Sequence, residues 1–457
     1  MEERIYLCLA HMSDEGLEQK YIKEAFDTNW VVPLGPNVDG FEEDLEKFVN
    51  RACNVKPEAF SKRVVALSSG TAAVHLALIA AGVKPGDEVL TQSFTFCASA
   101  HPITYIGATP IFIDSEPDTW NMDPKLLEEA IIDRKKKTGR LPKVILPVYL
   151  YGMPPKMDEI LAIGRKYGIT VVEDAAEGFG SLYRGRVGGT LGEYGVLSFN
   201  GNKMITTSGG GALICPTKEA KEKVMWLATQ ARESYPYCQH EAIGYNYRMS
   251  NICAGIGRGQ MTVARDHIAH HRHIAQLYKQ AFAETEGITY HDEYLGPSSE
   301  CPADTPLMES NFWLSTILLD DNLHVKGEEQ AYAEAVQGAV GGAAGVVHRG
   351  GALHTDCEPN RNVEAMRLAL IADGIESRPL WKPMHKQPVY CRTGANGKLQ
   401  SETLPSGTVC QTSAVSVAYI NGVSEKMFRR GLCLPSGPMV SDADVERIIS
   451  TIKNSLR

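Results

Sequence analysis

The chain has 457 residues, of which 43% are hydrophobic and 22% charged, and its formal net charge is −9. This length and composition indicate a globular protein with a large core and exclude a disordered chain. The acidic balance argues against a nucleic-acid partner, and no apolar stretch approaches the ~20 residues that span a bilayer.

The cysteines and the N-terminal stretch favour a cytoplasmic protein. The eleven cysteines are odd in number and include no C-x-x-C pair, which is typical of reduced thiols and offers no zinc site. The short apolar patch near the N-terminus has acidic residues on both sides and no basic region, so we expect no secretory signal and no membrane association.

Short apolar runs alternate with helix-period segments from about residue 60 to 215. The predicted strands are Arg63–Leu67, Glu88–Thr91, Thr109–Asp114, Lys143–Leu150, Ile169–Glu173 and Tyr194–Phe199. The predicted helices are Thr71–Ala81, Thr95–Ile106 with a break or kink near Pro102, Pro124–Asp133 capped by Asp123, and Met157–Tyr167. This alternation predicts an α/β fold whose central sheet is mostly parallel and covered by helices.

The pattern changes after a long predicted helix at Asn251–Phe282. Fewer strand–helix repeats follow, with two helices near the end at Val363–Ala372 and Asp442–Leu456, so we expect a smaller α+β domain. The predicted division is a large domain over 1–282, with an N-terminal arm over about 1–60, and a small C-terminal domain over 283–457. A Gly- and Ala-rich stretch at about 327–359 is interpreted as a surface insertion.

Two segments at predicted strand ends could bind an anion and a cation. Ser68-Ser69-Gly70-Thr71 opens a helix, whose free N–H groups suit a phosphate, although a plain helix cap explains the same residues. Glu173-Asp174 closes a strand at the edge where open α/β sheets bind ligands. A buried Asp there could pair with a protonated ring nitrogen, or it could cap a neighbouring helix.

A third segment, Ser198 to Lys203, places a lysine in a tight turn after a strand. A lysine at a sheet edge can act as a nucleophile, although an isolated lysine in a polar loop is usually solvated. A phosphate cradle, a buried acid and a nucleophilic lysine are together the supports that pyridoxal phosphate needs. Gly255-x-Gly257-x-Gly259 is similar to a dinucleotide-binding loop, but we do not expect it to be one, because it lies in a helical pattern without a preceding strand.

The chain also resembles a known family over nearly its whole length. The motifs that carry the resemblance are LGPNVDGFE, SSGTAAVHLAL, QSFTFCASA, VEDAAEGFGS, SFNGNK, GYNYRMS and RPLWKPMHKQP. They are similar to those of the pyridoxal-phosphate-dependent sugar-nucleotide aminotransferases of the DegT–StrS type, which have fold type I. SFNGNK with TTSGGG looks most like the branch that aminates C4 of UDP-4-keto-6-deoxy-N-acetylglucosamine.

The resemblance implies roles for the cofactor-binding residues. Lys203 resembles the lysine that bonds to the cofactor's aldehyde, and Asp174 resembles the partner of its ring nitrogen. The implied phosphate ligands are Gly70, Thr71 and Ser198. Phe96 falls where the family places an aromatic ring over the cofactor, with core packing as the alternative. Glu177 stands where many members have His or Gln, so its role, a contact to a cofactor oxygen or to the sugar, is left open.

Further residues are implied to reach a neighbouring subunit or the substrates. Asn246 resembles a residue that contacts the phosphate in the other subunit, which implies a homodimer with shared active sites. Arg248, Arg378 and His385 are candidate anchors for the donor's carboxylate or the nucleotide diphosphate. Each of the three could instead form an ordinary ion pair.

The implied reaction moves an amino group from L-glutamate to a keto sugar carried on a nucleotide. Lys203 would move the proton between the donor and the cofactor. Two alternatives use the same fold: a sugar dehydratase, whose members lack this lysine, and a non-catalytic regulator that binds pyridoxal phosphate.

Overall fold

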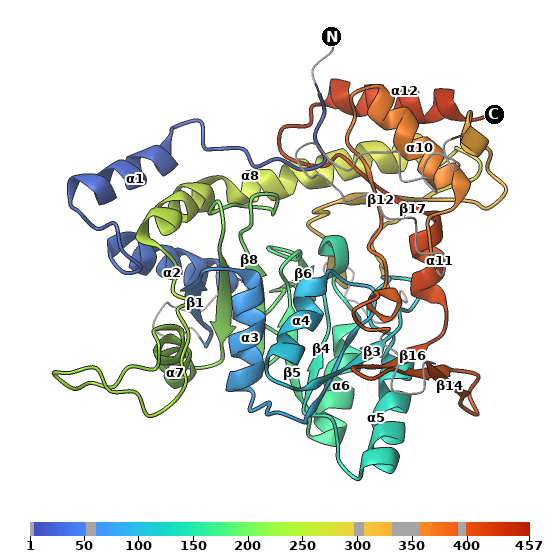
Figure 1. The fold of residues 1–457 in the computed structure, drawn as a ribbon. Coiled ribbons are helices and arrows are strands. Elements are labelled where there is room, and N and C mark those ends of the chain that lie inside the picture. The colour runs from blue at the N-terminus through green and yellow to red at the C-terminus, as the bar shows by residue number, and fades with distance from the viewer. Residues whose placement is uncertain (1–3, 52–60, 297–305, 331–356, 392–398) are drawn as a thin grey trace.

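A ten-stranded sheet forms the centre of the computed structural model, which describes residues 4–51, 61–296, 306–330, 357–391 and 399–457 (Figure 1). In spatial order its strands are β1 (Arg63–Leu67), β9 (Gly211–Cys215), β8 (Tyr194–Ser198), β5 (Thr170–Asp174), β4 (Val144–Leu146), β2 (Glu88–Gln92), β3 (Thr109–Ile113), β16 (Val417–Ile420), β15 (Val409–Thr412) and β14 (Gln400–Thr403).

The middle of this sheet is parallel, as predicted. Strands β8, β5, β4, β2, β3 and β16 all pair in parallel, whereas β9 runs antiparallel to both of its neighbours. Because β9 reverses direction between them, β1 and β8 run the same way. Successive residues of β1 enter different cores, with Val64 and Ala66 on one face and Val65 and Leu67 on the other. The sheet is therefore buried on both faces.

Helices cover the two faces. One face carries α3 (Gly70–Ala80), α4 (Cys97–Tyr105) and α7 (Lys218–Ala228). The other carries α2 (Pro36–Val49), α5 (Pro124–Thr138), α6 (Met157–Tyr167) and the first half of α8 (Asn251–Phe282). Helix α1 (Leu17–Asp27) lies against α8 beyond the end of the sheet (Figure 1).

A second, four-stranded sheet has the order β10 (Ile288–Tyr290), β12 (Ser315–Leu319), β17 (Gly431–Leu434) and β13 (Arg378–Pro379). The end of α8, α10 (Arg361–Ala372) and α12 (Asp442–Ser455) share a core with it, and α11 (Val423–Arg430) leads into β17. Strands β11 (Met308–Glu309), β6 (Leu182–Tyr183) and β7 (Arg186–Val187) form a small third sheet. Short 3-10 turns lie at Leu150–Gly152 and Met384–Lys386.

Several predicted boundaries are wrong, for local reasons. The strand predicted over 143–150 ends at Leu146, because Pro147 has no N–H to continue a ladder. The helix predicted to end at Asp133 continues to Thr138 and stops at Gly139, whose φ of 73° is left-handed. Helix α4 contains Pro102 without a break and starts two residues later than predicted. The long helix at Asn251–Phe282 is confirmed.

The predicted domain division also needs one correction. Residues 400–420, assigned by the sequence to the small domain, form β14, β15 and β16, and β16 pairs in parallel with β3. The C-terminal part of the chain therefore returns to the central sheet before it forms α11. The division at residue 282 otherwise stays a prediction, and most of the Gly- and Ala-rich stretch, residues 331–356, lies outside the described residues. No helix in the described ranges is long and apolar enough to cross a membrane.

Gly257 and Gly259 have a packing role in α8. A Cβ on Gly257 would lie 2.7 Å from the Phe41 ring of α2, and one on Gly259 would lie 2.6 Å from the Glu18 backbone N of α1. These glycines let α1 and α2 approach α8 closely.

We predict that Gly259→Ala lowers the free energy of unfolding by about 1–3 kcal/mol through overpacking. Alanine favours a helix by about 1 kcal/mol over glycine, so an isolated helix would respond in the opposite direction. Urea unfolding measures the change. Gly209→Ala, where an added Cβ meets nothing within 4 Å, is the matched control and should change stability by less than about 0.5 kcal/mol.

Candidate active site

The carboxyl ends of β1, β5 and β8 meet at one edge of the central sheet. Helix α3 starts directly after β1, and its N-cap Ser69 accepts a hydrogen bond from the Ala72 N–H at 3.0 Å. A Cβ on Gly70 would lie 3.0 Å from the Ser198 Cβ at the end of β8. The helix start and the Ser198 hydroxyl therefore line one cradle.

Asp174 closes β5 and is buried at this edge, with 3% of its surface exposed. Its Oδ2 accepts a hydrogen bond from Ser99 Oγ at 2.7 Å, and its Oδ1 accepts one from the Ala176 N–H at 3.1 Å. Burial raises the pKa of the Asp174 carboxyl, and the positive charge of Lys203 opposes that rise. Asp174 therefore lies at the same sheet edge as the turn after β8 that carries Lys203.

Glu173, the other acid of the pair, is on the opposite face of the strand because side chains alternate. Its carboxylate accepts hydrogen bonds from the Tyr149 hydroxyl at 2.5 Å and from the N–H groups of Gly189, Leu191 and Gly192 at 3.0, 2.7 and 2.5 Å. Glu173 thus organises the loop behind β5 and takes no part in the candidate site.

Lys203 lies in the turn after β8, with 13% of its side chain exposed. Its Nζ is 3.4 Å from Glu177 Oε1 and 3.8 Å from the centroid of the Trp313 ring. The Trp313 Nε1–H donates to the Asn202 carbonyl at 2.7 Å, so the same tryptophan also holds the turn that carries the lysine.

Glu177 is held from its other side by the backbone. Its Oε2 accepts a hydrogen bond from the Tyr151 N–H at 2.8 Å, and Tyr151 has a left-handed φ of 55°. Burial raises the pKa of the Glu177 carboxyl, while the charge of Lys203 and the Tyr151 N–H lower it.

These residues fit pyridoxal phosphate. A side chain on Gly70 would run into Ser198, which leaves the helix N-terminus and a hydroxyl for the phosphate. Asp174 offers a buried carboxylate for a protonated ring nitrogen, and Lys203 offers an amine for the aldehyde. The structure thus brings together Gly70, Ser198, Asp174 and Lys203 as expected; their roles stay predictions.

Phe96 and Asn246 lie on the rim of this region. Phe96 is 51% exposed, which is unlike core packing, and its ring centroid is 5.6 Å from that of Trp381. Asn246 is exposed and forms a β-bridge with Thr229, in a segment whose Tyr247 carbonyl accepts from the Ser68 N–H. The structure describes one chain, so the contact of Asn246 with a second subunit stays a prediction.

The three proposed substrate anchors are engaged by the chain itself. Arg248 is buried against the Glu42 carboxylate and donates to the Ala66 carbonyl at 2.9 Å. Arg378 is half exposed and pairs with Glu376 at 2.8 Å. The buried His385 lies between Ser93 Oγ, 2.6 Å from Nδ1, and Glu425 Oε1, 3.1 Å from Nε2. These contacts match the ion-pair alternative for Arg248 and Arg378, and substrate anchoring stays a prediction for all three.

Sequence reasoning missed Ser99, Tyr151 and Trp313. Ser99 lies in the QSFTFCASA motif, near the start of α4. Its position in the sequence gives no indication that it contacts Asp174. Trp313 is 110 positions from Lys203 in the sequence, so only tertiary folding joins them. The aromatic strip Asn311–Trp313 before β12 carried no recognisable signal.

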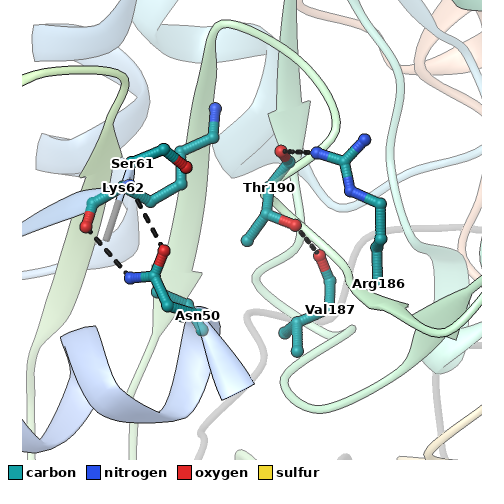
Figure 2. Close-up of a pocket in the computed structure, with 7 residues that line it drawn as sticks. Asn50, Ser61, Lys62, Arg186, Val187 and Thr190 are labelled. Atoms are coloured by element: carbon teal, nitrogen blue, oxygen red, sulfur yellow. Dashed lines mark hydrogen bonds between the residues drawn. The ribbon is translucent and has the colours of Figure 1, made fainter. Parts of the chain in front are cut away.

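Two other features of the described residues are separate from this site. A small pocket lies between the end of α2, the start of β1 and the segment after β6 (Figure 2). Its two cations already donate to backbone carbonyls, Lys62 to Gly192 at 2.8 Å and Arg186 to Thr190 at 2.7 Å. Asp133, Glu402 and Cys410 lie close enough together to ligate a metal. The Lys137 ammonium, however, already pairs with both carboxylates.

We predict that Arg248→Met lowers the free energy of unfolding by about 1–3 kcal/mol, because Glu42 loses its buried arginine and keeps Lys221 Nζ, at 3.0 Å, as its remaining charged partner. Arg378→Met, at a half-exposed pair, should cost less than about 1 kcal/mol. Denaturant unfolding compares the two variants. Equal stabilities would show that the Arg248–Glu42 pair does not stabilise the fold and would favour the role of Arg248 as a substrate anchor.

Comparison with known proteins agrees with this geometry. EpsN of Bacillus subtilis, whose own assignment as a pyridoxal phosphate-dependent aminotransferase is provisional, is 40% identical over 99% of this chain and 96% of its own length. GDP-perosamine synthase of Caulobacter vibrioides is 30% identical over 97% of this chain and 96% of its own. The crystal structure of a DegT DnrJ EryC1 StrS aminotransferase from Brucella abortus, 24% identical, superposes with a TM-score of 0.73 over 96% of this chain and 95% of its own, which shows the fold.

The family assignment rests on most of the chain. Residues 13–331 match the DegT/DnrJ/EryC1/StrS aminotransferase family, so the match includes every residue of the cradle, Asp174, Glu177, Lys203 and Trp313. The family resemblance and the expected cofactor are thereby confirmed. The chain belongs to the DegT/DnrJ/EryC1/StrS family of pyridoxal-phosphate-dependent aminotransferases.

Proposed function

We propose that this protein transfers an amino group from L-glutamate to a keto sugar of a nucleotide sugar, at C4 of UDP-4-keto-6-deoxy-N-acetylglucosamine. The observation that carries the proposal is the convergence of Lys203, Asp174 and the Gly70–Ser198 cradle at one sheet edge. The family supports amino transfer, and the SFNGNK and TTSGGG segments support the UDP-sugar branch.

Each residue has a defined task in this reaction. Bound pyridoxal phosphate supplies an electron sink for the carbanion that forms on the donor. The Ser198 hydroxyl and the start of α3 would hold the phosphate, and Asp174 would keep a proton on the ring nitrogen. Lys203 Nζ would take the proton from the donor's α-carbon and deliver it to the cofactor carbon that came from the aldehyde. Because Ser99 holds Asp174 Oδ2, the carboxylate keeps one orientation throughout.

We further propose a cytoplasmic homodimer with shared active sites. Large apolar side chains are exposed on α1, on the turn before α2 and on the segment that precedes Asn246; they include Phe26, Val31, Leu34, Tyr237 and Ile243. In Figure 1, α1 and the long loop after α7 lie on the same side of the molecule. A partner that covers these side chains would bring Asn246 towards the second site, and the odd set of free cysteines suits a reducing compartment.

A second candidate substrate is a GDP-linked keto sugar, because a relative that aligns over 97% of this chain is a GDP-perosamine synthase. A dehydratase is less compatible with the site, since Lys203 is present and faces the cradle edge with its Glu177 and Trp313 contacts. A non-catalytic regulator would not need that lysine to be held in place.

We predict that purified enzyme releases 2-oxoglutarate from L-glutamate when it is given the UDP-linked 4-keto sugar. A panel of UDP- and GDP-linked 4-keto and 3-keto sugars, followed by a coupled 2-oxoglutarate assay, separates the two candidates. The proposal expects the highest kcat/KM with the UDP-linked 4-keto sugar. Preference for a GDP-linked sugar would support the second candidate, and no release with any sugar would contradict amino transfer.

We also predict that Lys203→Ala lowers kcat by at least roughly 10²–10⁴-fold, because the proton carrier is removed. The matched control is Lys218→Ala on α7, whose side chain is 74% exposed and pairs with Glu222. The control should retain the wild-type rate. A Lys203→Ala variant that folds, binds the cofactor and turns over normally would overturn the assigned role.

A further inference from the structure

We propose that Glu177 is the positioning residue of Lys203: its carboxylate holds the lysine amine as an ammonium beside the cofactor-binding edge. The inference rests on the proposed function and deepens it. The direct observation is the ion pair itself, with Glu177 Oε1 3.4 Å from Lys203 Nζ and 5% of the Glu177 side chain exposed.

A second group favours the same charged form. The Trp313 ring faces Lys203 Nζ from 3.8 Å, and an aromatic face attracts a cation. Burial by itself disfavours the charge of a lysine that is only 13% exposed. A carboxylate on one side and a ring on the other offset that cost, and together they fix the direction of the side chain.

Glu177 is held too firmly to be an incidental neighbour. The Tyr151 N–H donates to its Oε2 at 2.8 Å, and Tyr151 keeps a left-handed φ of 55°, a conformation that non-glycine residues rarely adopt. Asn311 Nδ2 donates to the Glu177 carbonyl at 2.9 Å. Since Trp313 follows two residues later, Asn311 fixes both partners of Lys203 relative to each other.

The other titratable groups around the pair do not compete for this role. Burial raises the pKa of the Cys8 thiol to about 12, and it raises the pKa values of the Cys433 thiol and the Tyr151 hydroxyl as well, so these three stay neutral near pH 7 to 9. Asp174 is the second carboxylate that interacts with Lys203, and Ser99 and Ala176 hold its oxygens. Glu177 is thus the carboxylate in contact with the amine.

The ion pair with Glu177 affects when Lys203 Nζ can react. While Lys203 Nζ is protonated, Glu177 Oε1 pairs with it and the amine cannot attack or take a proton. Loss of that proton ends the ion pair and frees the amine as a nucleophile and base. Without the carboxylate, the amine should become reactive at lower pH, and its direction should be less defined.

The test is competitive labelling of the full-length protein, after removal of the cofactor, with a trace of acetic anhydride between about pH 6 and about pH 10. Mass spectrometry of the Lys203 peptide gives the pH midpoint of its acetylation. We expect Glu177→Gln, which keeps the shape and an oxygen for the Tyr151 N–H, to lower this midpoint by about one pH unit or more. Glu177→Asp, which keeps the charge but is one methylene shorter, should lower the midpoint by less than Glu177→Gln does.

The control is Glu173→Gln, which removes a buried carboxylate from the opposite face of β5. It should lower Tm without moving the Lys203 midpoint. The proposal is overturned if Glu177→Gln labels with the wild-type midpoint, or if Glu177→Asp shifts it as far as Glu177→Gln does. Should Glu177→Gln fail to fold, Glu177→Ala replaces it with the same expected direction, and an unshifted midpoint in that variant overturns the proposal.

Labelling needs neither an amino donor nor a sugar, so its outcome is independent of the proposed function. A shifted midpoint in a protein that releases no 2-oxoglutarate would keep the ion pair and reject amino transfer. An unshifted midpoint in an active aminotransferase would reject the role of Glu177 alone.

Discussion

The site depends on one constraint, that parallel strands bring their carboxyl ends to the same edge of a sheet. Strand β1 is separated from β5 and β8 by more than a hundred residues along the chain, yet the ends of the three strands bring Gly70, Asp174 and Ser198 to the same edge. Strand β9 makes this possible, because it runs antiparallel between β1 and β8 and lets both point the same way. The helix that follows β1 then presents its N-terminus to that edge.

Electrostatic balance is the second requirement of this edge. Two buried carboxylates, Asp174 and Glu177, share it with one ammonium, that of Lys203. Each carboxylate has a neutral donor of its own, from Ser99 in one case and from the Tyr151 N–H in the other. A bound cofactor with a protonated ring nitrogen would bring the second positive charge that Asp174 can accept. In the proposed roles, Asp174 would pair with the cofactor ring and Glu177 with the lysine.

Much of this arrangement was predictable from local patterns. The strand–helix alternation predicted the central sheet, the Asn251–Phe282 helix is confirmed, and the motif segments located Lys203 and Asp174. Several element boundaries were wrong for local reasons, whereas the pairings that the sequence did not reveal depend on distant contacts. Residues 400–420 join β3 across about 300 positions, and Trp313 meets Lys203 across 110, and neither pairing leaves a periodic signal in the sequence.

Single residues show the same limit at the level of side chains. The sequence left open whether Glu177 contacts a cofactor oxygen or the sugar, and whether Arg248 anchors a substrate or forms an ion pair, because both depend on which partner lies within reach. In the structure Arg248 pairs with Glu42 and Glu177 pairs with Lys203. Such choices depend on tertiary packing, which the order of residues does not display.

The central claim is that Lys203 is the amine that binds the cofactor's aldehyde. The most direct measurement is reduction of the purified, cofactor-loaded protein with sodium borohydride, followed by peptide mass spectrometry. The account predicts a phosphopyridoxyl group on the peptide that contains Lys203. A modified lysine elsewhere in the chain, or a loaded protein with no modified lysine, would contradict it.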